Sequence, residues 1–156
     1  MRIELFKASL ALLLLLTACQ TSSANGPSAL EQWSVAVTAC ADGVLPGYSP
    51  DKRCTIGSNG DVPLNPIDIS LTDIFENDNT TTTGRTDPTT GQSSLEGSLP
   101  KGFTPYVRRP EIATAPGIAG LLEAPDEATI VESKGNRIKI EIPYHLPVKP
   151  IDQEWG

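Results

Sequence analysis

Polar and apolar residues alternate most regularly near the C-terminus of the chain. Over residues 137–143, Arg137, Lys139 and Glu141 alternate with three isoleucines. A period of two is typical of a strand with one buried face. Residues 128–133 precede it, and Lys134-Gly135-Asn136 is a short, glycine-containing connection that suits a tight turn. The pattern predicts a C-terminal β-hairpin.

Residues 28–40 carry a second, more ambiguous pattern. Ser28 is suited to cap a helix, and Glu31 follows three residues later as in a capping box. Apolar residues recur at the spacing of one helix face: Leu30, Trp33, Val37 and Cys40. A strand is the competing interpretation, because every second residue from Trp33 to Ala39 is apolar and β-branched residues are frequent. We expect a helix.

The middle of the chain is interrupted by prolines. Pro63 and Pro66 exclude a regular central strand or helix over the first half of residues 62–75, which predicts an extended edge segment and then a helical turn at 71–75. Residues 99–124 contain four prolines and predict an irregular or polyproline-like course, with one helical turn at 118–123.

Residues 76–98 are rich in Thr, Asn, Ser, Gly and Asp and contain few apolar groups. Such a composition predicts a disordered linker.

The N-terminus has the layout of a secretory signal. Arg2 and Lys7 precede the apolar run 10–16, which ends in Leu16-Thr17-Ala18-Cys19. The run is shorter than the roughly 20 apolar residues that a transmembrane helix needs.

Leu16-Thr17-Ala18-Cys19 resembles the lipobox of bacterial lipoproteins. The resemblance implies cleavage before Cys19, a diacylglycerol on its thiol and usually a third acyl chain on its amino group, so that the protein is held on a membrane. Gln20 stands where an aspartate would retain an enterobacterial lipoprotein at the inner membrane, which implies the outer membrane. Residues 1–18 are then the signal peptide and 19–27 a polar, flexible tether.

Composition limits the classes of partner. The signal peptide contains two of the 12 basic and one of the 19 acidic residues, so the mature chain carries a net charge near −8. This charge argues against nucleic acid and against an electrostatically held membrane surface. With 14 prolines, 13 glycines and few aromatic residues, the chain is not expected to order throughout its length.

Lipidation of Cys19 leaves Cys40 and Cys54 as an even pair in an oxidising compartment. We expect a disulfide, which would close a loop rich in turn-forming residues. Free or redox-active thiols and metal ligation are the alternatives, although the spacing is not C-x-x-C and the chain has a single histidine.

Other candidate chemistry is weak. His145 has no partner in a recognisable motif. Residues 76–80 offer oxygen ligands but lack the glycine and closing glutamate of a calcium loop, and 79–81 formally match a glycosylation sequon. Residues 106–110 contain Arg108 and Arg109, a compact basic spot that could contact phosphate groups. We therefore expect no enzymatic activity, metal or cofactor.

Two classes of function remain. The favoured one is a non-enzymatic interaction or structural lipoprotein of a bacterial envelope assembly, of secretion, conjugation or phage-related type, whose extended segments and hairpin edge contact a protein partner. The alternative is a periplasmic or surface module for a small ligand or envelope polymer, which needs a concave pocket with aromatic side chains. The candidates are Trp33, Tyr48, Phe103, Tyr106, Tyr144 and Trp155.

The expected fold is a small single domain, α+β or mostly β, with one N-terminal helix, a C-terminal β-hairpin and much irregular or disordered chain. Residues 28–75 would form its N-terminal part with the disulfide loop. Residues 99–156 would contribute the Pro-rich segment, the hairpin and an extended tail.

Overall fold

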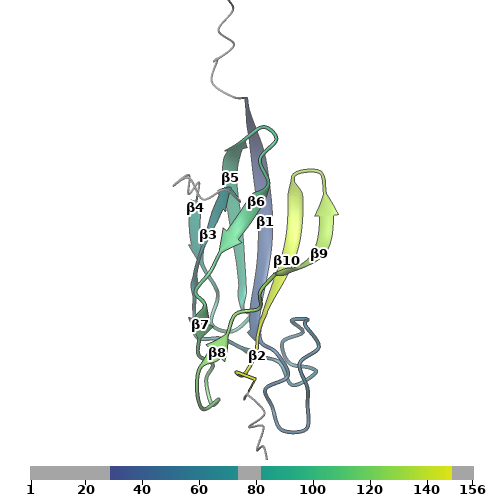
Figure 1. Cartoon of the computed structure of the whole chain (residues 1–156), viewed down its shortest axis with the longest axis vertical. Coiled ribbons are helices and arrows are strands. Elements are labelled where there is room, and N and C mark those ends of the chain that lie inside the picture. Colours follow the sequence, from purple (N-terminus) through teal and green to yellow (C-terminus); the bar gives the residue numbers. More distant parts are fainter. Residues whose placement is uncertain (1–28, 74–81, 149–156) are drawn as a thin grey trace, which may run out of the picture.

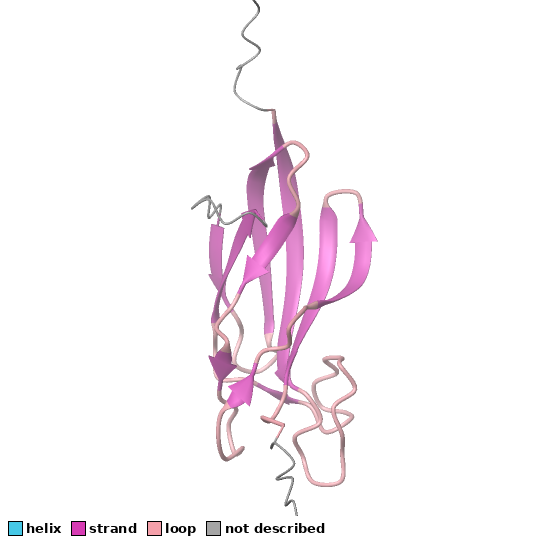
Figure 2. Cartoon of the chain, viewed as in Figure 1, coloured by secondary structure: helices cyan, strands magenta, loops and turns pink. Residues whose placement is uncertain are grey.

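The computed structural model describes residues 29–73 and 82–148. All regular structure in these two ranges is β (Figure 2). The strands are β1 (Leu30–Ala41), β2 (Val62–Pro63), β3 (Asp68–Asp73), β4 (Thr82–Arg85), β5 (Gln92–Pro100), β6 (Pro105–Arg108), β7 (Ile112–Ala113), β8 (Leu122–Glu123), β9 (Thr129–Lys134) and β10 (Arg137–Tyr144). The fold is therefore mostly β, and the predicted mixture with an N-terminal helix is wrong.

β1 is the centre of the larger sheet. β10 lies parallel along one edge of β1, and β5 lies antiparallel along the other edge, where β2 continues the pairing at the end of β1. β9 follows β10 at the outside of the sheet. A second sheet has the order β4-β3-β6, and β7 pairs with β8 in a small third sheet (Figure 1).

The two larger sheets enclose one hydrophobic core. β1 contributes Val35 and Val37, β3 contributes Ile69 and Leu71, and β5, β6, β7, β8 and β10 add further side chains to the same cluster. Both valines are 1% exposed, whereas Ala36 between them faces solvent. This alternation is the one that the competing strand interpretation of residues 28–40 had recognised, so the helix prediction is wrong.

The helix prediction failed because β1 finds partners on both edges. Its pairing with β5 runs from Leu30 opposite Pro100 to Thr38 opposite Gln92. Local capping signals contribute on the order of 1 kcal/mol, whereas two ladders satisfy the backbone groups of almost the whole strand and bury its β-branched face.

The disordered linker predicted over 76–98 is also wrong from residue 82 onward, because that range contains β4 and most of β5. β5 is polar along one face and supplies only Leu95 and Leu99 to the interior. Gly97 lies opposite Trp33 and has no side chain to pair with the indole ring. A strand with so few apolar residues depends on its partner, which composition does not reveal.

Two predicted helical turns are also wrong, because each overlaps a strand. The turn predicted at 71–75 falls partly in β3, which ends at Asp73, and the turn predicted at 118–123 overlaps β8. In contrast, the C-terminal hairpin is confirmed as β9 and β10. The signal peptide, Cys19, the tether, the calcium-like run 76–80, the sequon and Trp155 lie outside the described residues.

β1 and β10 set the polarity of the molecule. Because they run parallel, from Ser34 opposite Arg137 to Ala41 opposite Tyr144, β1 starts and β10 finishes at opposite ends of the sheet. In Figure 1 the described chain begins at the top and finishes at the bottom. The 12 residues of β1 span roughly 40 Å.

We predict that Gly91→Ala destabilises the fold by about 3 kcal/mol, because Gly91 has a positive φ of 65° and an added Cβ would lie 2.2 Å from the carbonyl oxygen of Ala39. Gly135→Ala is the matched control, since Gly135 has a similar φ of 57° with nothing within 4 Å. It should cost only about 1 kcal/mol. Urea unfolding of both variants measures the difference, and equal costs would contradict the close approach of Gly91 to β1.

Candidate functional site

The lower end of the molecule in Figure 1 is built from three separate segments. We call it the tip and define it as residues 42–61, which connect β1 to β2, residues 110–127, which contain β7 and β8, and residues 145–148, which follow β10. It lies at the opposite end of β1 from Leu30.

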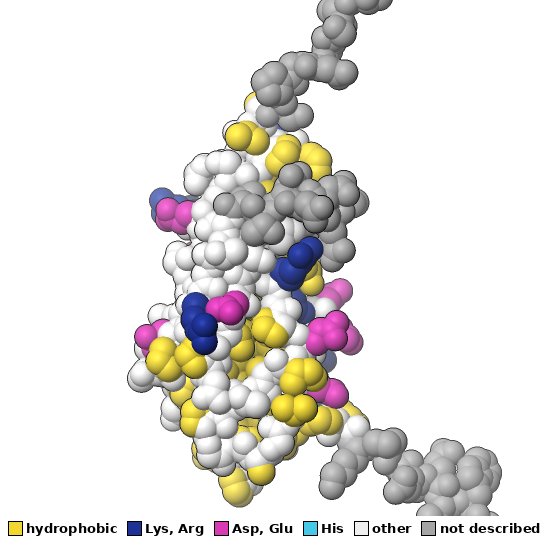
Figure 3. All heavy atoms as spheres, turned by 90° about the vertical axis from the view of Figure 1, so that its left-hand side faces the viewer, with side chains coloured by type: hydrophobic (Ala, Val, Ile, Leu, Met, Phe, Trp, Pro, Cys, Tyr) yellow, Lys and Arg dark blue, Asp and Glu magenta, His cyan; other side chains and the backbone are white. Residues whose placement is uncertain are grey.

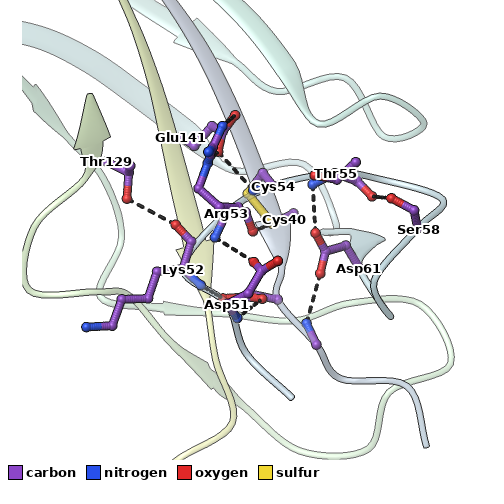
Figure 4. The surroundings of a disulfide bond; sticks show 12 residues. Cys40, Asp51, Lys52, Arg53, Cys54, Thr55, Ser58, Asp61, Thr129 and Glu141 are labelled. Carbon is purple, nitrogen blue, oxygen red and sulfur yellow. Dashed lines mark hydrogen bonds and ion pairs between the residues drawn. A yellow bond between two sulfur atoms is a disulfide. The ribbon is translucent and has the colours of Figure 1, made fainter. Parts of the chain in front are cut away.

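A disulfide attaches the first of these segments to the central strand. Cys40 at the end of β1 and Cys54 are bonded, with their Cα atoms 5.6 Å apart (Figure 4). This is the pairing expected from the sequence. A bond that closes a loop of about 15 residues contributes roughly 3 kcal/mol in the chain-entropy model. It holds a glycine- and proline-rich loop against the sheet.

Three carboxylates organise the same loop, two of them buried and the third, Asp51, exposed. Asp42 accepts hydrogen bonds from the backbone N–H groups of Asp51 and Lys52, at 3.0 and 2.8 Å. Asp61 accepts from Gly43 and Thr55, at 2.9 and 2.7 Å (Figure 4). Backbone donors that no strand uses are thereby satisfied by buried side chains.

The third carboxylate, Asp51, accepts from the backbone of Arg53 and from the side chain of Asn59. Oxygens of Asp42, Asp51 and Asp61 lie within 4.8 Å of one another, and this is the group among the described residues that could share a cation. Each of the six oxygens already accepts an N–H donor from the loop. The cluster is therefore assigned to loop folding.

Burial raises the pKa of Asp42, and the neighbouring charges of Asp61 and Asp51 act in the same direction, against the two backbone hydrogen bonds. Sequence reasoning missed this cluster. The available signal was weak: Asp42 precedes a glycine and Asp61 follows one, in a loop where aspartates often bind nearby backbone groups.

Glu141 ties the loop to the second central strand. Its buried carboxylate on β10 accepts from Arg53 Nε at 2.7 Å and from the backbone N–H of Cys54 at 3.0 Å. Burial alone would raise the pKa of Glu141, but these hydrogen bonds and the charges of Arg53 and Lys139 together hold the pKa below its ordinary value of 4.5. The ionised form therefore stabilises the contact.

Exposed apolar side chains gather at the tip. Six of the nine large hydrophobic residues that are exposed in the described ranges belong to it: Leu45, Tyr48, Ile112, Leu121, Leu146 and Val148. On the face shown in Figure 3, several hydrophobic side chains are exposed in the lower half, among polar atoms and a few charged groups. Apolar side chains concentrated in one region are typical of an interaction surface.

Two grooves flank a ridge at residues 124–126. One, of about 820 Å³, lies between the disulfide loop, residues 125–129 and residues 143–148. The other, of about 650 Å³, lies on the side of β6 and β7. Arg109 supports the ridge, because its Nη2 donates to the carbonyl oxygens of Pro125 and Asp126, at 2.6 and 3.3 Å.

This role of Arg109 bears on the suggested phosphate contact at residues 106–110. The guanidinium donates to backbone carbonyls, and the adjoining groove is lined by Arg108 and by three acidic side chains, Glu111, Glu123 and Asp126. The acidic side chains outnumber Arg108 and oppose the binding of a phosphate group. The geometry therefore favours a structural role for Arg109.

The candidate aromatic residues do not converge on one pocket. Tyr144 is fully buried, and its hydroxyl donates to the carbonyl oxygen of Pro110 at 2.6 Å. That burial raises the pKa of Tyr144 to about 12. Trp33 and Tyr106 line different hollows, while Tyr48 is exposed in the disulfide loop.

His145 lies at the edge of the larger groove, and its backbone forms an isolated bridge with Glu123. No helix in the described residues is long and apolar enough to cross a bilayer. Comparisons with protein-family models, with curated proteins and with solved structures found no match to this chain.

We predict that Glu141→Gln lowers the free energy of unfolding at neutral pH by about 1 to 2 kcal/mol. The ion pair itself contributes little because half of the Arg53 side chain is exposed, so most of the loss comes from the weakened hydrogen bonds of a buried group.

Because the pKa of Glu141 is depressed in the folded state, its ionisation stabilises the fold fully above its ordinary pKa and progressively less as the pH falls through the lower, folded value. The difference between the variant and the parent should therefore shrink below about pH 4. Urea unfolding near neutrality and near pH 3 measures this, with Glu132→Gln on the exposed face of β9 as control. A difference that stayed constant would show that the carboxylate charge is unimportant.

Proposed function

We propose that the chain is a non-enzymatic, lipid-anchored lipoprotein of a bacterial envelope assembly, and that it contacts a protein partner through its tip. The lipobox resemblance at residues 16–19 supports the anchor, and Gln20 supports the outer membrane as its site. Cys19 precedes β1 in the sequence, and the parallel pairing of β1 with β10 is the observation that carries the proposal. β1 begins at the end of the sheet opposite the tip, which supports an anchor at the one end and a partner at the other.

The tip has the properties that a docking surface needs. Its exposed aliphatic and aromatic side chains provide apolar area, and the disulfide and the buried carboxylates hold its loops in place before binding. A preorganised surface loses less conformational entropy when a partner binds. Roughly 40 Å of β1 and the tether would carry this surface away from the lipid.

The edge of the C-terminal hairpin is a poorer candidate for the docking surface. β1 covers one side of β10, and the other strand, β9, presents Glu132 and Lys134 and has an irregular register opposite Lys139 and Ile140. Charged side chains and bulges are features that discourage strand addition at a sheet edge. The alternative of a ligand-binding module has less support, because the aromatic residues are dispersed.

The anchor is tested by Cys19→Ser. We expect the variant to move from the membrane fraction to the soluble envelope fraction, because two or more acyl chains provide the stable attachment. Fractionation followed by immunoblotting measures the distribution, and metabolic labelling with a fatty acid analogue gives an independent readout. A variant that stays membrane-bound and a parent that takes up no label would overturn the anchoring.

The docking surface is tested by photocrosslinking in intact cells of the source bacterium. A benzophenone amino acid at Leu45 or Leu121 of the tip should give a discrete crosslinked protein, while the same group at Glu132 on β9 or Glu96 on β5 should not. All four positions are exposed, so accessibility is matched. Crosslinks from β9 or β5 without any from the tip would place the partner elsewhere.

A further inference from the structure

The larger groove of the tip is a built feature with three walls. We call it the tip groove; it is lined by Asp42, Pro50 and Lys52 of the disulfide loop, by residues 125–129, and by Pro143, His145, Leu146 and Val148. The hydroxyl of Thr129 donates to the carbonyl oxygen of Lys52 at 3.1 Å and joins two of the walls. The base of the groove adjoins Asp42, whose carboxylate is fixed by backbone donors.

Much of the lining is apolar. It includes three prolines, an alanine, Leu146 and Val148, and the last of these is 83% exposed. Prolines in the walls reduce the freedom that the backbone has to lose on binding. At about 820 Å³, the groove has the size of a site for a small molecule or a few residues of a peptide.

The charge of the groove is predominantly negative. Asp42, Asp126 and Glu127 contribute acidic groups, and Lys52 is the one lysine or arginine of the lining. Asp126 and Glu127 are exposed, and their side chains form no ion pair within the described ranges. A cationic group bound here would meet a groove of complementary charge, which favours its binding over that of an anionic group.

We propose that the tip groove binds a segment of the partner protein in which lysine or arginine stands next to bulky aliphatic residues. This inference rests on the proposed function and specifies its partner. The aliphatic side chains pack on the prolines, Leu146 and Val148, and the cationic groups face Asp126 and Glu127. An anionic lipid or phosphate group is disfavoured by the same two carboxylates.

Defined peptides test the proposal on the full-length protein in nonionic micelles. The probe is a fluorescent octapeptide with a Lys-Leu-Arg-Leu core and Gly-Ser flanks. Its counterparts carry glutamate in place of the basic residues, or serine in place of the leucines. We expect fluorescence anisotropy to show binding of the first peptide at least tenfold tighter than of either counterpart, with empty micelles as the blank.

Charge reversal locates the site. The double variant Asp126→Lys, Glu127→Lys should weaken binding of the cationic peptide at least tenfold and improve binding of the anionic one. Glu96→Lys, Glu132→Lys makes the same change in net charge at exposed positions on β5 and β9 and should leave both affinities within twofold. Val148→Ser should weaken binding without any change in charge.

Several results would overturn the inference. These are equal binding of the cationic and anionic peptides, equal binding of the leucine and serine peptides, and equal effects of the two charge-reversal variants. The in-cell crosslinks separate this failure from a failure of the proposed function. If the tip crosslinks a partner but the peptides do not discriminate, the partner class is wrong and the docking surface stands.

Discussion

The arrangement of this protein depends on the backbone hydrogen bonds of one strand. β1 pairs with β5 and β2 along one edge and with β10 along the other. It therefore joins segments whose paired residues lie between 21 positions apart (Ala41 and Val62) and 103 positions apart (Ser34 and Arg137) in the chain. The pairing buries Val35 and Val37 in the core. Because β1 and β10 run parallel, the start of β1 and the end of β10 lie at opposite ends of the sheet.

The tip is held by a different kind of interaction. Its longest loop contains no regular element between Asp42 and Asp61, so its backbone donors would be unsatisfied without help. Buried aspartates, Glu141 and the disulfide provide that help. Each carboxylate placed in the interior loses hydration, and the hydrogen bonds compensate for it. Because the disulfide and the buried carboxylates order this loop, it does not need to bury its exposed apolar side chains to stay folded.

The proposed membrane attachment and the proposed partner binding lie in separate parts of the chain. The proposed lipid lies before β1, and the proposed docking surface lies beyond its far end. The apolar groups of the tip are accompanied by exposed acidic ones, which favour a cationic partner and disfavour anionic membrane surfaces. The net charge of the whole chain is also negative.

Sequence by itself determined the features that depend on neighbouring residues or on simple counting. The alternation over 137–143 predicted the hairpin, because a half-buried strand requires a period of two. The even number of cysteines left after Cys19 predicted the bond between Cys40 and Cys54. The lipobox resemblance likewise depends on contiguous residues, and it remains a prediction.

Only the tertiary structure decided what depends on distant partners. Whether residues 28–40 form a helix or a strand was settled by β5 and β10, which lie far along the chain, and β5 is too polar to be recognised alone. The aspartate cluster was hidden for a related reason, since its partners are backbone N–H groups that every residue except proline carries. The tip itself is formed from three distant segments and exists only once the sheets have assembled.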